Sequence, residues 1–210
     1  AGEFRFLAGS IGRAAAERIV LAFERAQREG LPMFAAPSSG GTRMQEGTPA
    51  FLGMVKISAS VASFKAAGLP YVVYLRHPTT GGVLASWGSL GHVTVAEPGA
   101  TIGFLGARVY EALYGRPFPP GVQTAENLYE RGILDAIIPV ERLADMASRI
   151  LGILDARHTD LPAVPSPEPD PYAGAEPPVP AWDSIVLSRK LDRPGAKSLL
   201  KFGASEVLLL

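Results

Sequence analysis

Two glycine pairs constrain this chain more than any other feature of its sequence. The first is Gly40 and Gly41, and the second is Gly81 and Gly82; each follows a short apolar segment typical of a strand and precedes helix-forming sequence. Because glycine has no Cβ, nearby backbone N–H groups can approach a ligand closely, and the first N–H groups of a helix have no intrahelical partner. Either turn alone could simply connect a strand to a helix. Both together predict a site that binds an oxyanion or a phosphate through main-chain donors.

Apolar segments and helical periodicity alternate along most of the chain. Strands are expected at residues 1–7, 31–36, 71–75, 93–96 and 135–139. Helices are expected at residues 13–28, 45–67, from the second glycine pair to 90, 108–114, 124–131 and 140–154. Strands that alternate with helices through short connections predict an α/β fold with right-handed crossovers, with the glycine turns gathered at one end of the strands.

The composition excludes several classes of function. The chain of 210 residues carries 20 basic and 20 acidic residues, so binding to nucleic acid or to an anionic membrane is not expected. With no cysteine it has no disulfide framework, thiol nucleophile or thiolate metal site. No apolar run reaches the roughly 20 residues that span a bilayer, and Glu3 and Arg5 interrupt any secretory signal. These features fit a cytoplasmic enzyme.

The sequence changes character toward its end. Residues 159–181 are rich in proline, which predicts an extended linker between domains. Residues 1–158 are expected to form one domain, and residues 182–210 to begin a second, truncated one. The chain opens without methionine and stops in the apolar run 207–210, so we interpret it as an internal piece of a larger protein.

Side-chain chemistry offers few alternatives to a backbone site. No Gly-x-Ser-x-Gly motif surrounds a serine, no Gly-x-Gly-x-x-Gly opens the first helix, and no Gly-Lys-Ser/Thr occurs; this argues against a hydrolase, a Rossmann fold and a P-loop. The three histidines show no metal-ligand spacing, so no metal is expected. Only His77, beside the second glycine pair, is placed to touch a substrate, and we interpret it as an ordinary strand-end residue.

Three charged residues lie close to the glycine pairs in sequence. Glu46 and Glu97 are the nearest carboxylates, but neither is a convincing general base of the kind a hydratase or isomerase requires. Glu46 is expected to cap the helix that follows Gly41, where the helix dipole favours an acidic side chain, and Glu97 to lie in a turn before Pro98. Arg43 could bind a phosphate or pair with a nearby acid, and the sequence does not distinguish these roles.

The first glycine pair also carries a specific resemblance. The segment from Ser39 to Glu46 reads Ser-Gly-Gly-Thr-Arg-Met-Gln-Glu and resembles the Ser-Gly-Gly-Ala-Arg-Met-Gln-Glu signature of the β subunit of bacterial acetyl-CoA carboxylase carboxyltransferase. The resemblance covers residues 1–154, and residues 182–210 are similar to the start of the family's α half, as in a form with both halves in one polypeptide. Many β subunits carry a four-cysteine zinc ribbon that is missing here, so no metal is implied. Further matching motifs lie at residues 68–71, 78–86, 96–98, 102–109 and 130–135.

This resemblance implies a crotonase-like fold, a ββα superhelix, and a defined reaction. The carboxyl group would pass from carboxybiotin to acetyl-CoA, giving malonyl-CoA for fatty acid biosynthesis. The biotin would be held by a biotin carboxyl carrier protein and loaded by an ATP-dependent biotin carboxylase. Biotin itself would take the proton after releasing CO2, which would explain the missing side-chain base. The protein would stabilise the thioester enolate with main-chain donors, and losing one such donor can cost about 3 kcal/mol.

The resemblance also assigns residues to this reaction. Gly81 and Gly82 match the pair implicated in the oxyanion hole for the acyl-CoA carbonyl, which makes them the catalytic candidates. An α-like half or subunit would supply the hole for the biotin ureido oxygen, so the active site would lie at an interface between two crotonase-like halves, and an oligomer is expected. The expected substrate-binding residues are Gly40, Gly41, Arg43, Gly103 and Gly106.

Several alternatives stay open. Propionyl-CoA could take the place of acetyl-CoA. A biotin-independent malonate decarboxylase has a β subunit of related fold and would act on a malonyl group held by an acyl-carrier protein. A non-catalytic CoA-binding module could keep the fold without turnover. Inhibition by avidin separates the transferase from the decarboxylase, and CoA binding without turnover would indicate the third.

Overall fold

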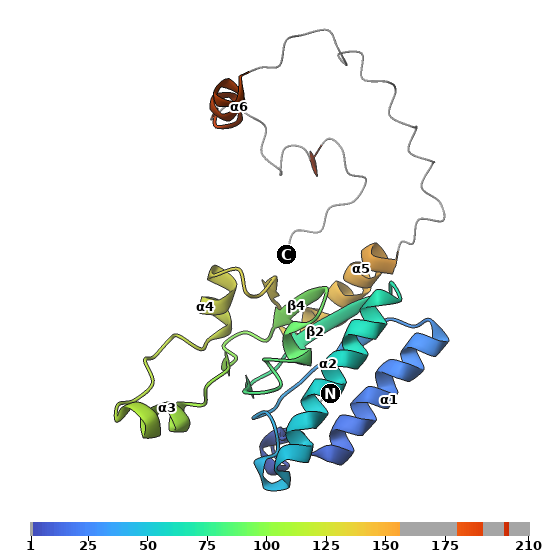
Figure 1. Cartoon of the computed structure of the whole chain (residues 1–210), viewed down its shortest axis with the longest axis vertical. Coiled ribbons are helices and arrows are strands. Elements are labelled where there is room, and N and C mark those ends of the chain that lie inside the picture. The colour runs from blue at the N-terminus through green and yellow to red at the C-terminus, as the bar shows by residue number, and fades with distance from the viewer. Residues whose placement is uncertain (1, 156–179, 191–199, 202–210) are drawn as a thin grey trace. The chain divides into compact units, whose positions relative to one another are not determined.

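The computed structural model describes residues 2–155, 180–190 and 200–201 (Figure 1). The chain divides into two compact units. Residues Ala1–Asp155 of the first contain the sheets and both glycine loops, and in the second, Ala156–Leu209, helix α6 spans Ala181–Ser188. The linker expected at residues 159–181 lies outside the described residues except for its last two, and much of the domain expected at 182–210 lies outside them as well.

Four parallel strands form the main sheet, in the order β1-β2-β4-β6. Every residue of β2 is buried, because both faces of a parallel sheet are covered, and this explains the continuous apolar run in the sequence. The strands expected at residues 71–75 and 93–96 are confirmed with the same bounds. The four strands are β1 (Met33–Ala35), β2 (Tyr71–Leu75), β4 (Val93–Ala96) and β6 (Ala136–Ile137).

Two long helices lie side by side against the main sheet (Figure 1). The rings of Phe23, Phe64 and Tyr71 meet edge to face at this contact, with Phe23 centred 5.5 Å from Phe64 and 5.1 Å from Tyr71. The helices approach closely because a Cβ at Gly53 would lie only 2.7 Å from the Cβ of Ala16. The helices are α1 (Arg13–Glu29) and α2 (Thr48–Ala66), and α5 (Leu143–Asp155) follows the last strand.

A second sheet of two short strands pairs β3 (Thr79–Thr80) with β5 (Ile102–Gly103). Single bridges extend it to Ser39 beside β3 and to Thr124 beside β5. The sequence did not indicate this sheet, because strands of two residues are too short to show a periodic pattern. The small sheet joins both glycine loops to the segment around Gly103, and it therefore positions the candidate site.

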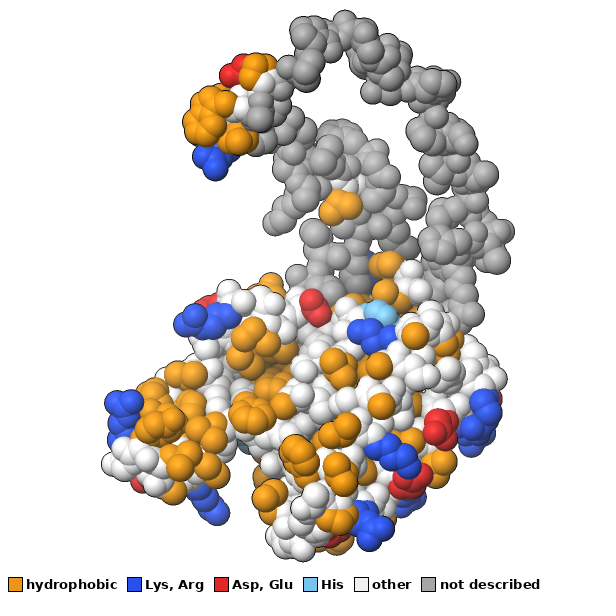
Figure 2. All heavy atoms as spheres, in the orientation of Figure 1, with side chains coloured by type: hydrophobic (Ala, Val, Ile, Leu, Met, Phe, Trp, Pro, Cys, Tyr) orange, Lys and Arg blue, Asp and Glu red, His pale blue; other side chains and the backbone are white. Residues whose placement is uncertain are grey.

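Two short helices follow β5. Helix α3 (Ala107–Tyr114) projects away from the main sheet (Figure 1), whereas α4 (Ala125–Glu130) contacts strand β6 and buries Ala125. Helix α3 buries none of its residues, and its apolar side chains gather on the surface in Figure 2. Val109, Leu113 and Tyr114 are all exposed there. In the part of the chain that is described, no helix is long and apolar enough to cross a bilayer.

The strand expected at residues 1–7 is wrong for the described residues 2–7. Residues 4–6 form a turn, and a 3-10 helix, η1 (Leu7–Gly9), follows it with positive φ angles of 48° at Leu7 and 54° at Ala8. The side chains of Phe6 and Leu7 are both exposed, so the alternation in the sequence does not correspond to one buried and one exposed face.

The helix expected from Gly82 to residue 90 is also wrong. One helical turn forms, in which the Ala85 amide donates to the Gly81 carbonyl at 3.1 Å. The chain then bends at Ser86 into a 3-10 helix, η3 (Trp87–Ser89). The Ser86 hydroxyl donates to the Gly82 carbonyl, and such local side-chain bonds compete with a continuous helix.

The helix expected at residues 45–67 is divided. A 3-10 helix, η2 (Met44–Glu46), comes first, and α2 begins at Thr48 because Gly47 has a φ of 64° that a right-handed helix cannot include. Another 3-10 helix, η4 (Val140–Arg142), likewise precedes α5. The other expected helices and strands are confirmed, with bounds that shift by a residue or two.

Candidate functional site

The two glycine loops pack against each other backbone to backbone. Gly41 has a φ of 105°, and a Cβ at this position would lie only 3.0 Å from the Gly82 nitrogen. A Cβ on Gly81 would lie 3.1 Å from the Gly40 carbonyl oxygen. Each pair therefore needs glycine because the other pair occupies the space that side chains would fill, whatever ligand binds beside them.

Hydrogen bonds of the small sheet hold this contact together. The Ser39 amide donates to the Pro78 carbonyl at 2.8 Å, and the Thr80 amide donates to the Ser39 carbonyl at 2.8 Å. The buried Ser39 hydroxyl donates to the Gly9 carbonyl at 2.7 Å and accepts from the Gly41 amide at 3.1 Å. The first glycine loop is thus bound on both sides by main-chain and side-chain groups.

Three of the four glycine amides already donate to acceptors within the chain. No described residue accepts a hydrogen bond from the fourth, Gly82. The Gly81 amide, expected to be a second donor to a ligand, is one of the three that are occupied. The occupied amides are Gly40, which donates to the Ala8 carbonyl (2.8 Å), Gly41, which donates to the Ser39 hydroxyl (3.1 Å), and Gly81, which donates to the Gly103 carbonyl (3.0 Å).

The Gly82 amide opens the single helical turn that Ala85 closes. The next two amides, of Val83 and Leu84, also have no acceptor among the described residues. Unpaired amides in a first helical turn point along the axis and attract anionic groups. Because Gly82 alone of the three has no side chain, its N–H is the one that a ligand oxygen can approach most closely.

Thr42 is a neighbouring donor that the sequence analysis missed. Ile11 bridges to it in parallel, with the Ile11 amide donating to the Gly41 carbonyl at 2.8 Å and the Arg43 amide donating to the Ile11 carbonyl at 2.9 Å. In such a bridge the amide of Thr42 itself faces away from Ile11. A Cβ at Gly82 would lie 2.7 Å from the Thr42 hydroxyl and 3.7 Å from the Thr42 nitrogen. The only sequence signal is that Thr42 directly follows the first pair.

Arg43 is bound to its own chain through each of its three side-chain nitrogens. Nη2 donates to the Ser10 carbonyl at 2.8 Å, Nε donates to the Ser10 hydroxyl at 3.1 Å, and Nη1 pairs with Glu46 at 3.2 Å. Glu46 also accepts from the amide of Arg13, the first residue of α1, at 2.7 Å. This bond is the main cause that lowers the pKa of the Glu46 carboxyl. Glu46 does cap a helix, but the helix is α1 rather than the one that follows it.

Gly103 and Gly106 have different surroundings. A Cβ at Gly103 would lie 2.2 Å from the side-chain Cδ of Gln123, whose amide donates to the Leu105 carbonyl at 2.8 Å. Gly106 precedes α3 with an ordinary φ of −64°, and no atom of the described residues lies within 4 Å of the place its Cβ would take. Gly103 is therefore joined to the second glycine loop, because its carbonyl accepts from the Gly81 amide. Among the described residues, Gly106 has no hydrogen bond to either glycine loop.

The His77 and Glu97 side chains bind the backbone. His77 Nδ1 accepts from the Thr101 amide at 3.1 Å, and the His77 amide donates to Glu97 at 2.9 Å. The Glu97 carbonyl accepts from the Ala100 amide at 3.2 Å, in the turn that was expected there. Within the described ranges, no three histidine, aspartate or glutamate side chains are grouped closely enough to hold a metal ion.

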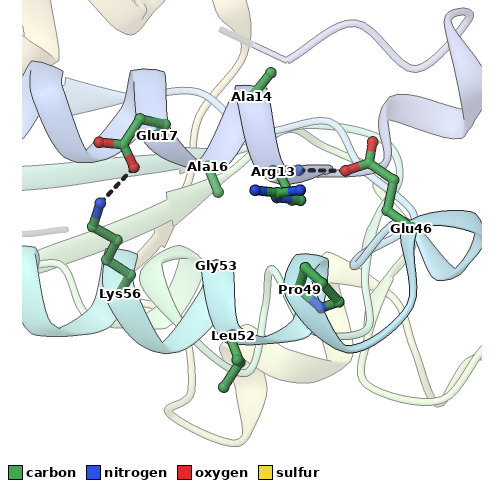
Figure 3. Close-up of a pocket in the computed structure, with 9 residues that line it drawn as sticks. All are labelled: Arg13, Ala14, Ala16, Glu17, Glu46, Pro49, Leu52, Gly53 and Lys56. Atoms are coloured by element: carbon green, nitrogen blue, oxygen red, sulfur yellow. Dashed lines mark hydrogen bonds and ion pairs between the residues drawn. The ribbon is translucent and has the colours of Figure 1, made fainter.

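A groove of about 650 Å³ lies between the first halves of α1 and α2 (Figure 3). Lys56 on α2 pairs with Glu17 on α1 across the groove, and the bond between the Arg13 amide and Glu46 lies toward its other end. None of the four paired glycines lines it, so the groove is separate from the amide of Gly82. Its lining residues are Arg13, Ala14, Ala16, Glu17, Glu46, Pro49, Leu52, Gly53 and Lys56.

The sequence is similar to those of known proteins. Residues 1–171 match the model of the carboxyl transferase domain. Over 208 residues the chain is 62% identical to a probable biotin-dependent acyl-coenzyme A carboxylase beta3 subunit of Mycobacterium tuberculosis, covering 99% of this chain and 41% of that protein. Over 154 residues it is 47% identical to the acetyl-coenzyme A carboxylase carboxyl transferase subunit beta of Sinorhizobium medicae, covering 73% of this chain and 51% of that protein. The chain thus spans only 41% to 51% of the length of these relatives.

A solved structure shares the fold. The transcarboxylase 12S crystal structure with methylmalonyl-coenzyme A and methylmalonic acid bound matches with a TM-score of 0.61 at 22% identity, over 71% of this chain and 29% of that chain. At this identity the likeness shows the fold alone. The crotonase-like α/β fold implied by the sequence resemblance is confirmed, and its parallel main sheet brings the two glycine loops together.

Proposed function

The chain belongs to the carboxyl transferase domain family, and from this premise we propose that it is the β-type carboxyltransferase part of a biotin-dependent acyl-CoA carboxylase. The reaction moves a carboxyl group from carboxybiotin to the α-carbon of a CoA thioester, which is the methyl carbon in acetyl-CoA. Acetyl-CoA is the proposed substrate, and malonyl-CoA is the product. The name of the Sinorhizobium medicae relative supports acetyl-CoA, whereas the name of the Mycobacterium tuberculosis relative specifies no acyl group.

The amide of Gly82, which has no acceptor among the described residues, carries this proposal. Removing a proton from the carbon next to the thioester carbonyl, the methyl carbon of acetyl-CoA, places negative charge on the thioester oxygen. A fixed N–H aimed at that charge stabilises it more than it stabilises the neutral carbonyl. The Thr42 amide lies beside Gly82 and has no acceptor among the described residues, so it can donate a second hydrogen bond to the same oxygen. The Gly81 amide orients this turn through its bond to the Gly103 carbonyl.

The described side chains around the glycine loops offer no free general base. The carboxylates of Glu46 and Glu97 and the imidazole of His77 all accept hydrogen bonds from backbone amides. Carboxybiotin, when bound, supplies the carboxyl group and leaves a ureido nitrogen that can accept the proton. The protein's own contribution is to bind the CoA thioester, hold its α-carbon in place and stabilise the developing charge.

The proposed enzyme needs partners. Residues 1–158 would bind acyl-CoA, residues 159–181 would form a linker, and residues 182–210 would begin an α-like domain that holds the biotin ureido oxygen. A biotin carboxyl carrier protein, loaded by a biotin carboxylase, would deliver the biotin in a cytoplasmic oligomer. The Mycobacterium tuberculosis relative supports this arrangement, because almost all of the chain matches it while covering only 41% of its length.

Malonyl-CoA formation by the complete enzyme, its α-like half included, tests the proposal. Gly82→Val should lower kcat by about 10²- to 10³-fold, as the loss of one oxyanion donor does, because the new side chain meets the Thr42 hydroxyl and displaces the Gly82 amide. Gly152→Ala, at an open position with an ordinary φ in helix α5, is the matched control and should keep full activity. Unchanged malonyl-CoA formation by Gly82→Val would falsify the site assignment.

Avidin and alternative substrates separate the rival activities. Avidin should abolish carboxyl transfer by sequestering biotin, and activity that avidin cannot block would indicate a malonate decarboxylase. A higher kcat/KM for propionyl-CoA than for acetyl-CoA would replace the proposed acyl group and leave the site unchanged. CoA binding without turnover of either thioester would indicate a non-catalytic module.

A further inference from the structure

The guanidinium of Arg43 is enclosed by its own chain. Each of its three nitrogens donates a hydrogen bond to Ser10 or Glu46, and its side chain is only 19% exposed. The ring of Phe6 covers one side, with its centroid 5.8 Å from the guanidinium carbon. Three of its five N–H donors are thus occupied, and a phosphate that used the whole fork would have to displace these partners.

Glu46 joins the guanidinium to the start of α1. One carboxylate oxygen accepts from Arg43 and the other from the Arg13 amide at 2.7 Å. A Cβ on Gly12 would lie 2.1 Å from the first of these oxygens, so α1 can approach the carboxylate this closely only because residue 12 is glycine. The pair of Arg43 and Glu46 thus fastens the beginning of α1 to the first glycine loop.

A short series of contacts leads from this pair to the proposed oxyanion donors. The Arg43 amide donates to the Ile11 carbonyl at 2.9 Å, and the Ile11 amide donates to the Gly41 carbonyl at 2.8 Å. These two bonds hold the peptide of Thr42 between them. Gly41 in turn lies against the nitrogen of Gly82, where a Cβ would be 3.0 Å away. Movement of Arg43 would therefore shift Gly41 and Thr42, which lie beside the Gly82 amide.

We infer that Arg43 and Glu46 are positioning residues for the oxyanion donors Thr42 and Gly82, and that Arg43 does not bind CoA. The inference rests on the proposed carboxyltransferase function, since turnover is what reveals a displaced donor. A displacement of about 1 Å in such a site can cost about 10²-fold in rate.

Arg43→Lys in the complete enzyme is the discriminating variant. Lysine keeps the positive charge but cannot reproduce the planar fork that reaches two oxygens of Ser10 and one of Glu46. The positioning role predicts that kcat falls by about 10- to 100-fold while KM for acyl-CoA changes by less than about 2-fold. A rise in KM with kcat unchanged would overturn the inference in favour of a CoA contact. Arg25→Lys is the matched control, because Arg25 pairs with Glu29 on the exposed face of α1.

A second variant tests whether the two residues act as a unit. If they do, Arg43→Ala combined with Glu46→Ala should lower kcat no more than the worse single variant, whereas independent effects would multiply and count against the network.

Amide hydrogen exchange provides a readout that does not depend on turnover. In Arg43→Lys the Gly41 amide should exchange faster than in wild type while Val73, in the buried strand β2, keeps its protection. Unchanged exchange at Gly41 would overturn the positioning role even if the wild-type enzyme transferred no carboxyl group. Failure of the wild type to transfer carboxyl groups would reject the proposed function separately.

Discussion

The two glycine loops look alike in sequence and differ in what completes their hydrogen bonds. In the first loop both glycine amides donate within the chain, and the side chains of Ser39, Arg43 and Glu46 hold the loop in place. In the second loop the Gly82 amide and the two that follow have no acceptor among the described residues. A glycine pair therefore does not itself make a binding site. The first glycine loop packs against the second and holds the Gly82 amide of the second loop in place.

The difference follows from what the chain does after each pair. After Gly41 the backbone stays extended and bonds with Ile11 on one side. After Gly81 it enters a helical turn, whose first amides have no partner within the turn. An extended segment thus closes most of its hydrogen bonds against neighbours, whereas a helical turn leaves donors at its start. That is why we propose the oxyanion site at the second pair.

Of the substitutions in the two glycine loops, Gly41→Ala should have the largest effect on stability. Alanine rarely adopts a φ of 105°, and its Cβ would be 3.0 Å from the Gly82 nitrogen, so the backbone would have to shift. We expect the free energy of unfolding, measured in urea, to fall by about 2 to 4 kcal/mol. Gly106→Ala, with open space and an ordinary φ, should change it by less than about 0.5 kcal/mol. Equal losses of unfolding free energy for Gly41→Ala and Gly106→Ala would show that the contact between the two glycine loops does not require glycine at residue 41.

Ser39→Ala should have an intermediate effect. It leaves the buried Gly41 amide without its acceptor and removes the hydroxyl donor to the Gly9 carbonyl, at a cost of about 1 to 3 kcal/mol in unfolding free energy. Ser86→Ala is the counterpart in the second loop. It removes a donor to the Gly82 carbonyl without stranding a buried amide, so we expect a loss below about 1 kcal/mol. Thermal unfolding of both variants measures which loses more stability. A larger loss of unfolding free energy for Ser86→Ala than for Ser39→Ala would contradict the prediction.

Glu46→Gln should have the smallest effect, confined to acid. The Arg13 amide lowers the pKa of Glu46 in the folded protein, so the carboxylate contributes its full stability above the ordinary pKa of about 4.3. That contribution is lost as the pH falls through the lower, folded pKa. The unfolding free energy of wild type should therefore drop more steeply below about pH 4 than that of Glu46→Gln. Parallel pH profiles for the two proteins would show that Glu46 is not held by Arg13 in solution.

Much of the fold was predictable because its signals are local. The buried run of β2 and the periodicity of α1 gave bounds within a residue of those observed. The small sheet was missed because two residues carry no period, and the strand expected at residues 1–7 was wrong because exposed phenylalanines imitated alternation. The helix expected after Gly82 was wrong because the Ser86 hydroxyl competes with its hydrogen bonds.

The candidate site was predictable only as far as the two loops. The positions of both glycine pairs, each after a strand, could be predicted from local sequence, because a missing Cβ and an apolar run act on the residues beside them. Which glycine amide has no acceptor among the described residues depended on the tertiary structure, because the acceptor for Gly81 is the carbonyl of Gly103, brought beside it by the small sheet. The tertiary structure also placed Thr42 next to Gly82, since contacts between distant segments depend on how the whole chain packs.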